Sequence, residues 1–340
     1  MARRGRPAAS LSSPVTALAG LLALLTILST LFSRDPAASA RHLAGISLLL
    51  LLPIAMDLCD EPRKARLLFL ALAAGGAVLS LVGFWQFAHG GDGLENRIMS
   101  TLSHWMTFSG LAMIAGCLLL GFAFEGRGVW RALGLLAIVP LSAMVLTFTR
   151  GGYVGTLAAV ALYLLLFRPR GLLVFVPLLL ALFLLLPSTI RSRAVSIASL
   201  EERTNRDRIA MVHAGLRLLR ESPLLGIGPD MVQRYYPLYR DPDAPQWRVP
   251  HLHNNVLQIA VASGLFAAAA YLGLMALFFA RTVVFLRREK RPDRAALLAG
   301  AFLAGTALFI AGFFEYNFGD TEIEMATLLV LAVPFSKATS

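Results

Sequence analysis

Residues 171–187 read GLLVFVPLLLALFLLLP, and residues 188–193, which follow directly, read STIRSR. The first stretch holds no charged residue, whereas the second opens a polar loop that runs to Asn255 and contains ten arginines and no lysine. Apolar residues make up 57% of the 340 positions, and apolar runs of bilayer-crossing length recur along the chain. The sequence therefore predicts a membrane protein with one large polar loop and excludes a soluble multidomain protein.

The predicted fold class is an all-α polytopic membrane protein of about ten transmembrane helices with a large external loop that itself contains helices. Three segments follow: an N-terminal bundle of about seven spans (1–187), the loop (188–254), and about three C-terminal spans (255–340). The predicted spans are 15–32, 41–57, 67–88, 105–124, 130–148, 151–167, 171–187, 255–280, 295–314 and 321–335.

Charge is divided unevenly between the two sides of this predicted membrane domain. With the N-terminus inside, alternation of the spans places all three lysines and most of the remaining arginines in the cytoplasm, as the positive-inside rule expects. Topology thus accounts for much of the net charge of +11, and no nucleic-acid partner is expected. The connections assigned to the outside are 33–40, 89–104, 149–150, 188–254 and 315–320, and those assigned to the cytoplasm are 58–66, 125–129, 168–170, 281–294 and the C-terminal tail.

The ten loop arginines run against the positive-inside rule, which makes them candidates for binding an anionic ligand. The alternative is an ordinary solvated surface, because seven acidic residues share the loop and exposed ion pairs contribute little each. The apolar residues Ile209, Val212, Leu216 and Leu219 predict an amphipathic helix over 206–221 that either docks onto the bundle or lies on the membrane. Beyond it, a turn is expected at Gly226, Gly228 and Pro229. The aromatic residues that follow are expected to anchor at the lipid headgroups or, alternatively, to stack on a sugar; they are Tyr235, Tyr236, Tyr239 and Trp247.

Two further features concern processing and redox chemistry. Cys59 and Cys117 lie at the end of one span and within another, so we expect packing residues, not a disulfide or a thiolate metal site. Basic residues ahead of the apolar run 15–32 resemble a signal peptide, but a run of about 18 residues is longer than the usual signal core and favours an uncleaved first span. These basic residues are Arg3, Arg4 and Arg6.

The phrase Pro250-His251-Leu252-His253-Asn254-Asn255 stands where the loop returns to the membrane. A histidine at a wet interface can take a proton from an attacking hydroxyl near neutral pH. The alternative is a histidine pair ahead of a helix that Asn254 or Asn255 caps. No further ligand nearby in sequence completes a zinc site, so no metal or other cofactor is predicted.

Arginine recurs in three other candidate positions on the external side. Arg150, in Thr149-Arg150-Gly151-Gly152-Tyr153, lies at a junction of two spans, where its planar fork suits a phosphate. The alternative is structural pairing with an acidic residue, one of Glu315, Asp320, Glu322 or Glu324. Arg208 falls at the start of the predicted loop helix, where free N–H groups favour anions. Arg97, with His104, is a weaker candidate of the same kind. A metal site at Asp241-Pro242-Asp243 is the weakest, because a proline turn explains that motif as well.

Together these elements resemble the bacterial O-antigen ligase and polymerase superfamily, over residues 95 to 335. The resemblance rests on Thr149 to Tyr153, on Arg208 followed by ESPLLGIGP at 221–229, and on His251-Leu252-His253-Asn254. The ligase pattern of a histidine, then Asn, Ser or Gln, nine residues and Gly-x-x-(Gly, Thr or Tyr) is met by His253, Asn254 and Gly264. It fails at Ala267, and fewer spans precede the loop than in most such ligases, so the choice of ligase within the superfamily is less specific than membership.

The resemblance implies a GT-C-like membrane glycosyltransferase in the bacterial inner membrane, with its active site facing the periplasm. It would transfer a glycan from undecaprenyl diphosphate, with inversion and without metal, to a hydroxyl of lipid A-core oligosaccharide. His253 would be the catalytic base, and the substrate would be bound by Arg150, Arg208, Asn254, Arg97, His251 and Tyr153. The alternatives are an O-antigen polymerase, a protein O-oligosaccharyltransferase, and a transporter of the lipid-linked glycan. Apart from the glycan donor and acceptor, membrane lipids are the only expected partners.

Overall fold

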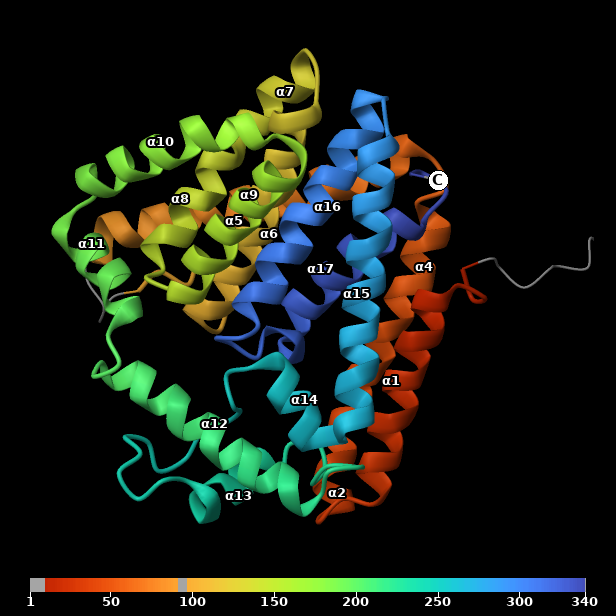
Figure 1. Cartoon of the computed structure of the whole chain (residues 1–340), viewed down its shortest axis with the longest axis vertical. Coiled ribbons are helices and arrows are strands. Elements are labelled where there is room, and N and C mark those ends of the chain that lie inside the picture. The colour runs from red at the N-terminus through yellow and green to blue at the C-terminus, as the bar shows by residue number, and fades with distance from the viewer. Residues whose placement is uncertain (1–9, 91–96, 340) are drawn as a thin grey trace, which may run out of the picture. The chain divides into compact units, whose positions relative to one another are not determined.

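The computed structural model describes residues 10–90 and 97–339, and every regular element in these residues is a helix (Figure 1). Eight helical segments in the described residues are long and apolar enough to cross a membrane. The predicted all-α polytopic fold is therefore confirmed. The basic residues ahead of the predicted first span lie outside the described residues. The eight segments are Pro14–Leu31, Pro36–Leu58, Pro62–Gly90, Trp105–Glu125, Val129–Leu146, Arg150–Phe167, Leu265–Arg288 and Pro292–Ala311.

The helices come in an order that includes several short or composite pieces. They are α1 (Pro14–Leu31), α2 (Pro36–Ser39), η1 (Ala40–His42), α3 (Leu43–Ile46), η2 (Ser47–Leu50), α4 (Leu51–Leu58), α5 (Pro62–Gly90), α6 (Trp105–Glu125), α7 (Val129–Gly134), η3 (Leu135–Ala137), α8 (Ile138–Leu146), α9 (Arg150–Phe167), η4 (Pro169–Gly171), α10 (Leu172–Leu185), α11 (Ser188–Val195), η5 (Ser196–Ala198), α12 (Arg203–Glu221), α13 (Val232–Tyr239), α14 (Asn255–Ser263), α15 (Leu265–Arg288), α16 (Pro292–Ala311), η6 (Asn317–Gly319), α17 (Thr321–Ala332) and η7 (Val333–Phe335).

Three of the ten predicted spans differ from this arrangement. The apolar helix Pro169–Leu185 is shorter than a full span, and α17 has only 12 residues before the chain turns into η7. The predicted span 255–280 is broken into α14 and α15 at Gly264, whose φ of 90° places it in the left-handed region. A Cβ at Gly264 would lie 1.9 Å from the Leu224 carbonyl oxygen, so only glycine fits this break.

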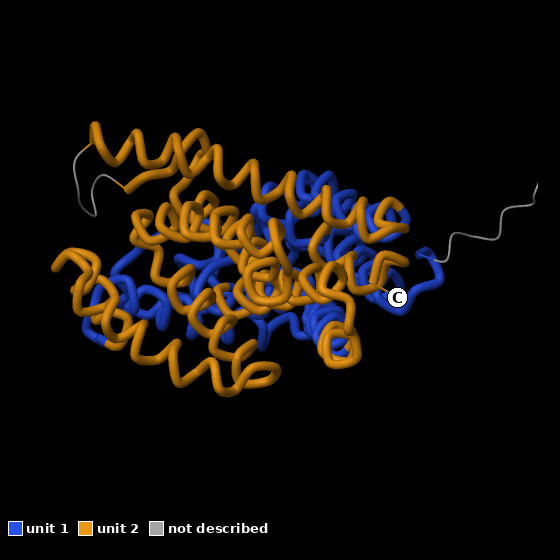
Figure 2. The backbone as a smooth tube through the Cα atoms, turned by 90° about the horizontal axis from the view of Figure 1, so that it is seen from above, with its two compact units in different colours: residues 1–57, 199–280, 312–328 blue, residues 58–198, 281–311, 329–340 orange. Residues whose placement is uncertain are grey.

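The chain forms two compact units, coloured separately in Figure 2. Unit 1 contains Met1–Asp57, Ser199–Ala280 and Gly312–Leu328. Unit 2 contains Leu58–Ala198, Arg281–Ala311 and Leu329–Ser340. Each unit takes residues from all three segments that were expected from the sequence, so sequence segments and compact units are different divisions of the chain.

Unit 2 is built around α6 and α16, the two candidate spans with the largest buried share. Their backbones lie in direct contact, because a Cβ on Gly121 would approach the Gly300 nitrogen to 2.3 Å. Small residues that allow such close approach are a common basis of helix packing in membranes. The reason is that apolar side chains are buried equally well against lipid and against another helix. Both cysteines are buried and free, as expected of packing residues.

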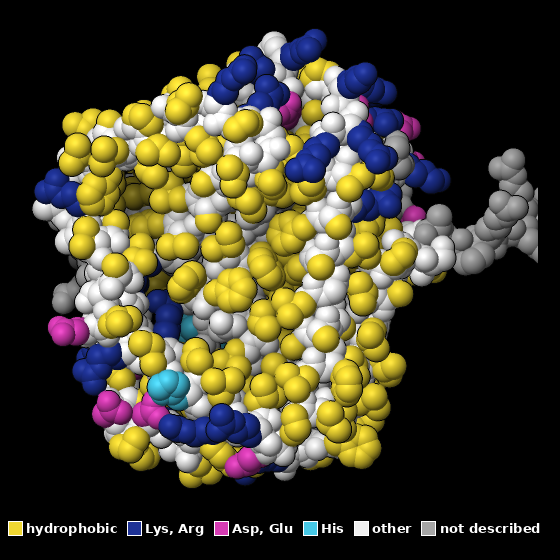
Figure 3. Space-filling view, viewed as in Figure 1, with side chains coloured by type: hydrophobic (Ala, Val, Ile, Leu, Met, Phe, Trp, Pro, Cys, Tyr) yellow, Lys and Arg dark blue, Asp and Glu magenta, His cyan; other side chains and the backbone are white. Residues whose placement is uncertain are grey.

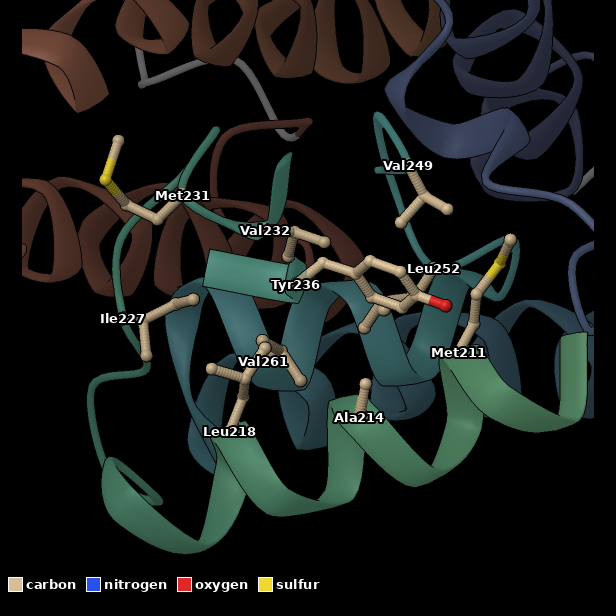
Figure 4. Packing of buried hydrophobic residues seen from close by; sticks show 10 residues of the cluster. All are labelled: Met211, Ala214, Leu218, Ile227, Met231, Val232, Tyr236, Val249, Leu252 and Val261. Carbon is tan, nitrogen blue, oxygen red and sulfur yellow. The ribbon is translucent and has the colours of Figure 1, made fainter. Parts of the chain in front are cut away.

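Unit 1 holds most of the loop, which has a hydrophobic core of its own (Figure 4). The core joins α12, the glycine turn, α13 and α14, and it includes the fully buried ring of Tyr236. Tyr236 is therefore a core residue, and the expectation of an interfacial anchor at this position was wrong. The ten buried members are Met211, Ala214, Leu218, Ile227, Met231, Val232, Tyr236, Val249, Leu252 and Val261.

The loop helix also differs from its prediction in start and in face. α12 begins at Arg203, three residues earlier than expected, because the Glu202 carboxylate accepts hydrogen bonds from the N–H groups of Thr204 and Asn205. Its docked face carries Met211, Ala214 and Leu218. Three of the four residues of the predicted stripe are turned outward, since Ile209, Val212 and Leu216 are 41%, 37% and 44% exposed. The fourth, Leu219, is partly buried against the loop core.

Connections predicted for one side of the membrane lie together within each unit. In unit 1, the Ser39 hydroxyl donates to the Pro229 carbonyl, which joins connection 33–40 to the loop. In unit 2, Arg168 forms an ion pair with Glu125 at 2.8 Å, which joins two connections assigned to the cytoplasm. Figure 3 shows basic side chains gathered at the turn between α15 and α16 and hydrophobic side chains along α15. The assignment of one side to the periplasm stays a prediction.

Candidate active site

The glycine turn fixes the loop against the break between α14 and α15. The N–H groups of Ile227 and Gly228 donate to the carbonyls of Val261 and Ala262 at 2.9 and 3.0 Å, and the Leu265 N–H donates to the Pro223 carbonyl at 2.8 Å. Gly226 and Gly228 have φ values of 72° and 106°, as a tight turn requires. The ESPLLGIGP segment of the resemblance therefore clamps the end of α14, the helix that follows the histidine motif.

The histidine motif is anchored between buried neighbours. Leu252 is 1% exposed, belongs to the loop core, and donates its N–H to Gln258 Oε1 at 2.9 Å. His253 has a φ of 49°, a left-handed conformation that costs free energy in a residue other than glycine. Asn254 is the N-cap of α14, because its side-chain oxygen accepts from the Leu257 N–H at 2.9 Å. The capping role considered for Asn254 is thus confirmed, and the same cap fixes the turn that carries His253.

Glu315 is the residue that the histidine motif meets. Its Oε1 lies 2.9 Å from His253 Nδ1 and 3.7 Å from His251 Nε2. The connection that carries Glu315 is fixed to the start of α14 by Asn255, whose N–H donates to the Gly312 carbonyl and whose Oδ1 accepts from the Phe318 N–H. Burial is high for a charged pair, since the side chains of His253 and Glu315 are 18% and 14% exposed.

Two opposing effects act on the Glu315 carboxyl. Burial raises its pKa, but contact with His253 and the nearby charges of His253, His251 and Arg208 outweigh burial, so the pKa lies below its usual range. The carboxylate therefore stays ionised at neutral pH. An ionised carboxylate beside Nδ1 favours the His253 tautomer with its proton on Nδ1, which leaves the Nε2 lone pair to accept a proton.

His251 supports this arrangement from one side. Its Nδ1 accepts a hydrogen bond from the His253 backbone N–H at 3.3 Å, so a neutral His251 ring carries its proton on Nε2, the atom nearer Glu315. The two imidazole rings lie with their centroids 4.3 Å apart, and Tyr316 packs on the other side of His251 at 5.7 Å. His251 therefore packs beside His253 and keeps it against the carboxylate.

His251, His253 and Glu315 also form a geometric ligand group, since one atom from each lies within 4.8 Å of the others. Glu315 supplies the third ligand that sequence spacing did not reveal. Tetrahedral zinc with bonds of about 2.0–2.1 Å would hold its ligand atoms about 3.3 Å apart. The observed separations from Glu315 Oε1 are 2.9 Å and 3.7 Å, and the shorter one is the distance of a direct ion pair. Proton sharing thus fits the His253–Glu315 pair better than tetrahedral coordination does.

Arg208 lies in the electrostatic neighbourhood of this cluster, because its charge is one of those that lower the pKa of Glu315. Arg208 was expected to lie beside the free N–H groups at the start of the loop helix, and this expectation was wrong. α12 starts at Arg203, so Arg208 falls in the second turn, beyond the free N–H groups of the helix start. What places Arg208 is the docked face of α12, on which the neighbouring Asp207 is also buried.

Arg150 is the first residue of α9 and is 5% exposed. Its Nη1 donates to the backbone carbonyl and to the hydroxyl of Ser196, at 3.0 and 3.2 Å. The preceding turn contains Phe148 at a φ of 54°, and the Phe148 carbonyl accepts from Arg193 Nε at 3.3 Å. Two arginines thus share one buried turn in unit 2, and the contribution of Arg193 was not foreseen from the sequence.

The remaining predicted substrate-binding residues have local contacts in unit 2. The Tyr153 hydroxyl donates to the Val145 carbonyl at 2.5 Å, so it ties α9 to α8. The Arg97 guanidinium lies over the Trp105 ring at 5.1 Å, and His104 caps α6 by accepting from the Met106 N–H. Binding of substrate by Tyr153 and Arg97 stays a prediction.

The Asp241-Pro242-Asp243 motif has a structural explanation. Asp241 lies 2.7 Å from His213 Nδ1 and 2.6 Å from Arg217 Nη2, so it joins α12 to the segment after α13. The hydrogen bond from His213, with a further one from Arg217, holds the pKa of the Asp241 carboxyl below its usual range. Asp243 lies 3.9 Å from Arg206. These contacts account for the motif without a metal.

One known family matches part of the chain. Residues 135–272 match the sequence model of the O-antigen ligase family. This segment carries the O-antigen ligase signature. The resemblance to the O-antigen ligase superfamily is thereby confirmed, and the eight candidate spans indicate a multi-pass membrane protein. The O-antigen ligase match includes Arg150, Arg208 and His253 but not Glu315. No curated protein matches the chain.

Proposed function

We propose that this protein is an O-antigen ligase that transfers a glycan from undecaprenyl diphosphate to a hydroxyl of lipid A-core oligosaccharide at the periplasmic face of the inner membrane. The observation that carries the proposal is the His253–Glu315 pair at 2.9 Å, within reach of the charge of Arg208. A base beside a cationic group is what a reaction needs when it deprotonates a hydroxyl and releases a diphosphate.

In the proposed reaction, His253 Nε2 takes the proton of the acceptor hydroxyl while that oxygen attacks the anomeric carbon of the donor sugar. The new bond joins the acceptor oxygen to the anomeric carbon, and the bond that breaks joins this carbon to the diphosphate oxygen. Attack from the face opposite the leaving group inverts the configuration. The bonding electrons leave on undecaprenyl diphosphate, and the proton stays on His253 until solvent removes it.

Arg208 and Arg150 are each proposed to bind a phosphate group of the donor. A guanidinium binds phosphate oxygens through two parallel N–H donors, and it stabilises charge that develops on the leaving group. Glu315 holds His253 in the tautomer required and stabilises the imidazolium that forms, as a carboxylate does for histidine in hydrolytic triads. No metal is required for these steps.

The experiment that tests this function supplies purified full-length protein with an undecaprenyl-diphosphate glycan and lipid A-core. A ligase forms lipopolysaccharide, detected as a product that carries both glycan and lipid A. A polymerase instead lengthens the lipid-linked glycan and leaves lipid A-core unchanged. Transport of the glycan across liposomes with no covalent product would contradict both enzymatic assignments.

A further inference from the structure

A second polar hollow in unit 1 is separate from the histidine cluster. It encloses about 520 Å³, a size typical of ligand sites, and is formed by the segment after α2, the glycine turn with α13, and the chain just before His251. Three arginines line it, against a single acidic residue, Asp230. Its lining residues are Ala38, Arg41, Asp230, Met231, Gln233, Arg234, Arg248 and Pro250.

The three arginines differ in how their charge is balanced. Arg234 forms an ion pair with Asp35 at 2.7 Å. Arg41 and Arg248 are exposed and have no hydrogen-bond or ionic partner among residues 10–90 and 97–339. Asp230, whose carboxylate lies 3.6 Å from His42 Nδ1, can balance at most one of these two charges. The hollow therefore holds an excess of positive charge.

The walls of this hollow are anchored to the loop core. Val249 and Met231 are 1% and 2% exposed members of that core, and Arg248 precedes Val249 directly (Figure 4). Asp230, next to Met231, has a φ of 60°, so a strained backbone is held in place by its surroundings. Cations fixed on a packed scaffold bind an anion at a smaller entropic cost than cations on a flexible loop.

The hollow is also close along the chain to the proposed base. His253 stands five positions after Arg248, which limits the distance between their Cα atoms to roughly 18 Å. A single bound molecule with an anionic group a few sugar units from its reacting hydroxyl can contact both positions. Pro250, which lines the hollow, stands next to His251 in the histidine motif.

We infer that this hollow binds an anionic group, a phosphate or a carboxylate, on the saccharide that accepts the glycan. The inference rests on the proposed function, because a saccharide is an acceptor only if the protein transfers a glycan to it. Binding of the saccharide can nevertheless be measured without catalysis. It also gives a role to one of the ten loop arginines that oppose the positive-inside rule, since Arg206, Arg217 and Arg234 are engaged by acidic residues.

The test measures equilibrium binding of lipid A-core to the full-length protein in detergent. Wild type is compared with the double variant Arg41→Gln and Arg248→Gln, and with Arg220→Gln as the matched control. Arg220 is an exposed arginine of α12 that does not line this hollow. Three probes are used: native lipid A-core, its phosphatase-treated form, and a form that is also reduced at its carboxyl groups.

Loss of two charge-assisted contacts should weaken binding of the native probe roughly tenfold or more in the double variant, with no change in the control. The fully neutralised probe should bind wild type and double variant alike, and the phosphatase-treated probe then shows whether phosphate or carboxylate is recognised. Equal binding of native probe to wild type and double variant would overturn the inference, as would an equal loss for native and neutral probes. If the protein proves not to be a ligase, the transfer assay fails while this binding result still stands.

Discussion

The turn at Arg150 in unit 2 and the turn at His253 in unit 1 are built alike but carry opposite partners. Each has a residue other than glycine in the left-handed region, Phe148 in one and His253 in the other. The Arg150 guanidinium donates to the backbone carbonyl and the hydroxyl of Ser196. His253 instead faces the Glu315 carboxylate, with 2.9 Å between Nδ1 and Oε1. One turn therefore presents a buried guanidinium and the other a histidine beside a carboxylate.

The largest effect is expected when the base is removed. His253→Ala should lower the transfer rate by about 10²–10⁴-fold, the usual contribution of a general base, while binding of the diphosphate lipid stays near wild type. The measurement is single-turnover glycan transfer together with donor binding. His213→Ala is the matched control, because His213 belongs to the same loop and lies against Asp241. Wild-type transfer in the His253 variant would refute the role of this turn in proton transfer.

Removal of the orienting carboxylate should have the next largest effect. Glu315→Gln keeps the shape of the side chain but gives up the charge that favours the Nδ1 proton, so kcat should fall by about 10²-fold with little change in KM. Steady-state kinetics of wild type and variant measure the two parameters separately. A rise in KM with an unchanged kcat would contradict this role and show that Glu315 acts on substrate binding instead.

Substitution of Arg150 and Arg208 tests the proposed binding of the diphosphate. Arg150→Gln and Arg208→Gln should each weaken binding of undecaprenyl diphosphate by about tenfold, since a hydrogen bond to a charged group is worth roughly 1.5–3 kcal/mol. Isothermal or fluorescence titration in detergent measures this. Arg203→Gln, at the exposed start of α12, is the control. Undiminished binding in both variants would remove these arginines from the donor site.

The smallest effect is expected at the Asp241 cluster. Asp241→Asn should reduce the free energy of unfolding by about 1 kcal/mol or less and leave transfer unchanged, because exposed ion pairs are weak. The pKa of Asp241 is lowered in the folded protein, so its contribution is complete above the unfolded pKa and is lost as pH falls through the folded pKa. Thermal unfolding at neutral and acidic pH checks this, and the difference between wild type and variant should vanish in acid. Loss of transfer at neutral pH would reinstate the motif as functional.

Local sequence signals predicted much of this structure. Apolar runs located most of the spans, the ESPLLGIGP segment predicted its turn, and the residues around His253 and Arg150 fell on turns that each contain a left-handed residue. The errors in the start and the docked face of α12 arose because other residues nearby could fill the same structural roles. Glu202 supplied an earlier cap for α12, and an alternative apolar face with Met211, Ala214 and Leu218 was docked instead of the predicted one.

Contacts distant in sequence could not be predicted in the same way. Glu315 was considered only as one of several partners for Arg150, because nothing in the spacing of the chain shows that its connection meets the start of α14. That meeting depends on the paired side chains of Asn255 and Asn317 and on the Asn255 N–H, which are visible only in the folded chain. The break at Gly264 was hidden likewise, since its cause is the carbonyl of Leu224 on the packed glycine turn.

The most direct test of the central claim is whether glycan transfer by the purified wild-type protein needs a metal. His251, His253 and Glu315 are close enough either to share protons or to hold an ion, and the two roles make opposite predictions for chelation. Transfer should continue at the same rate after exhaustive EDTA treatment, and added Zn²⁺ should not increase it. Loss of transfer on chelation, with recovery when Zn²⁺ is restored, would contradict the account and make the cluster a metal centre.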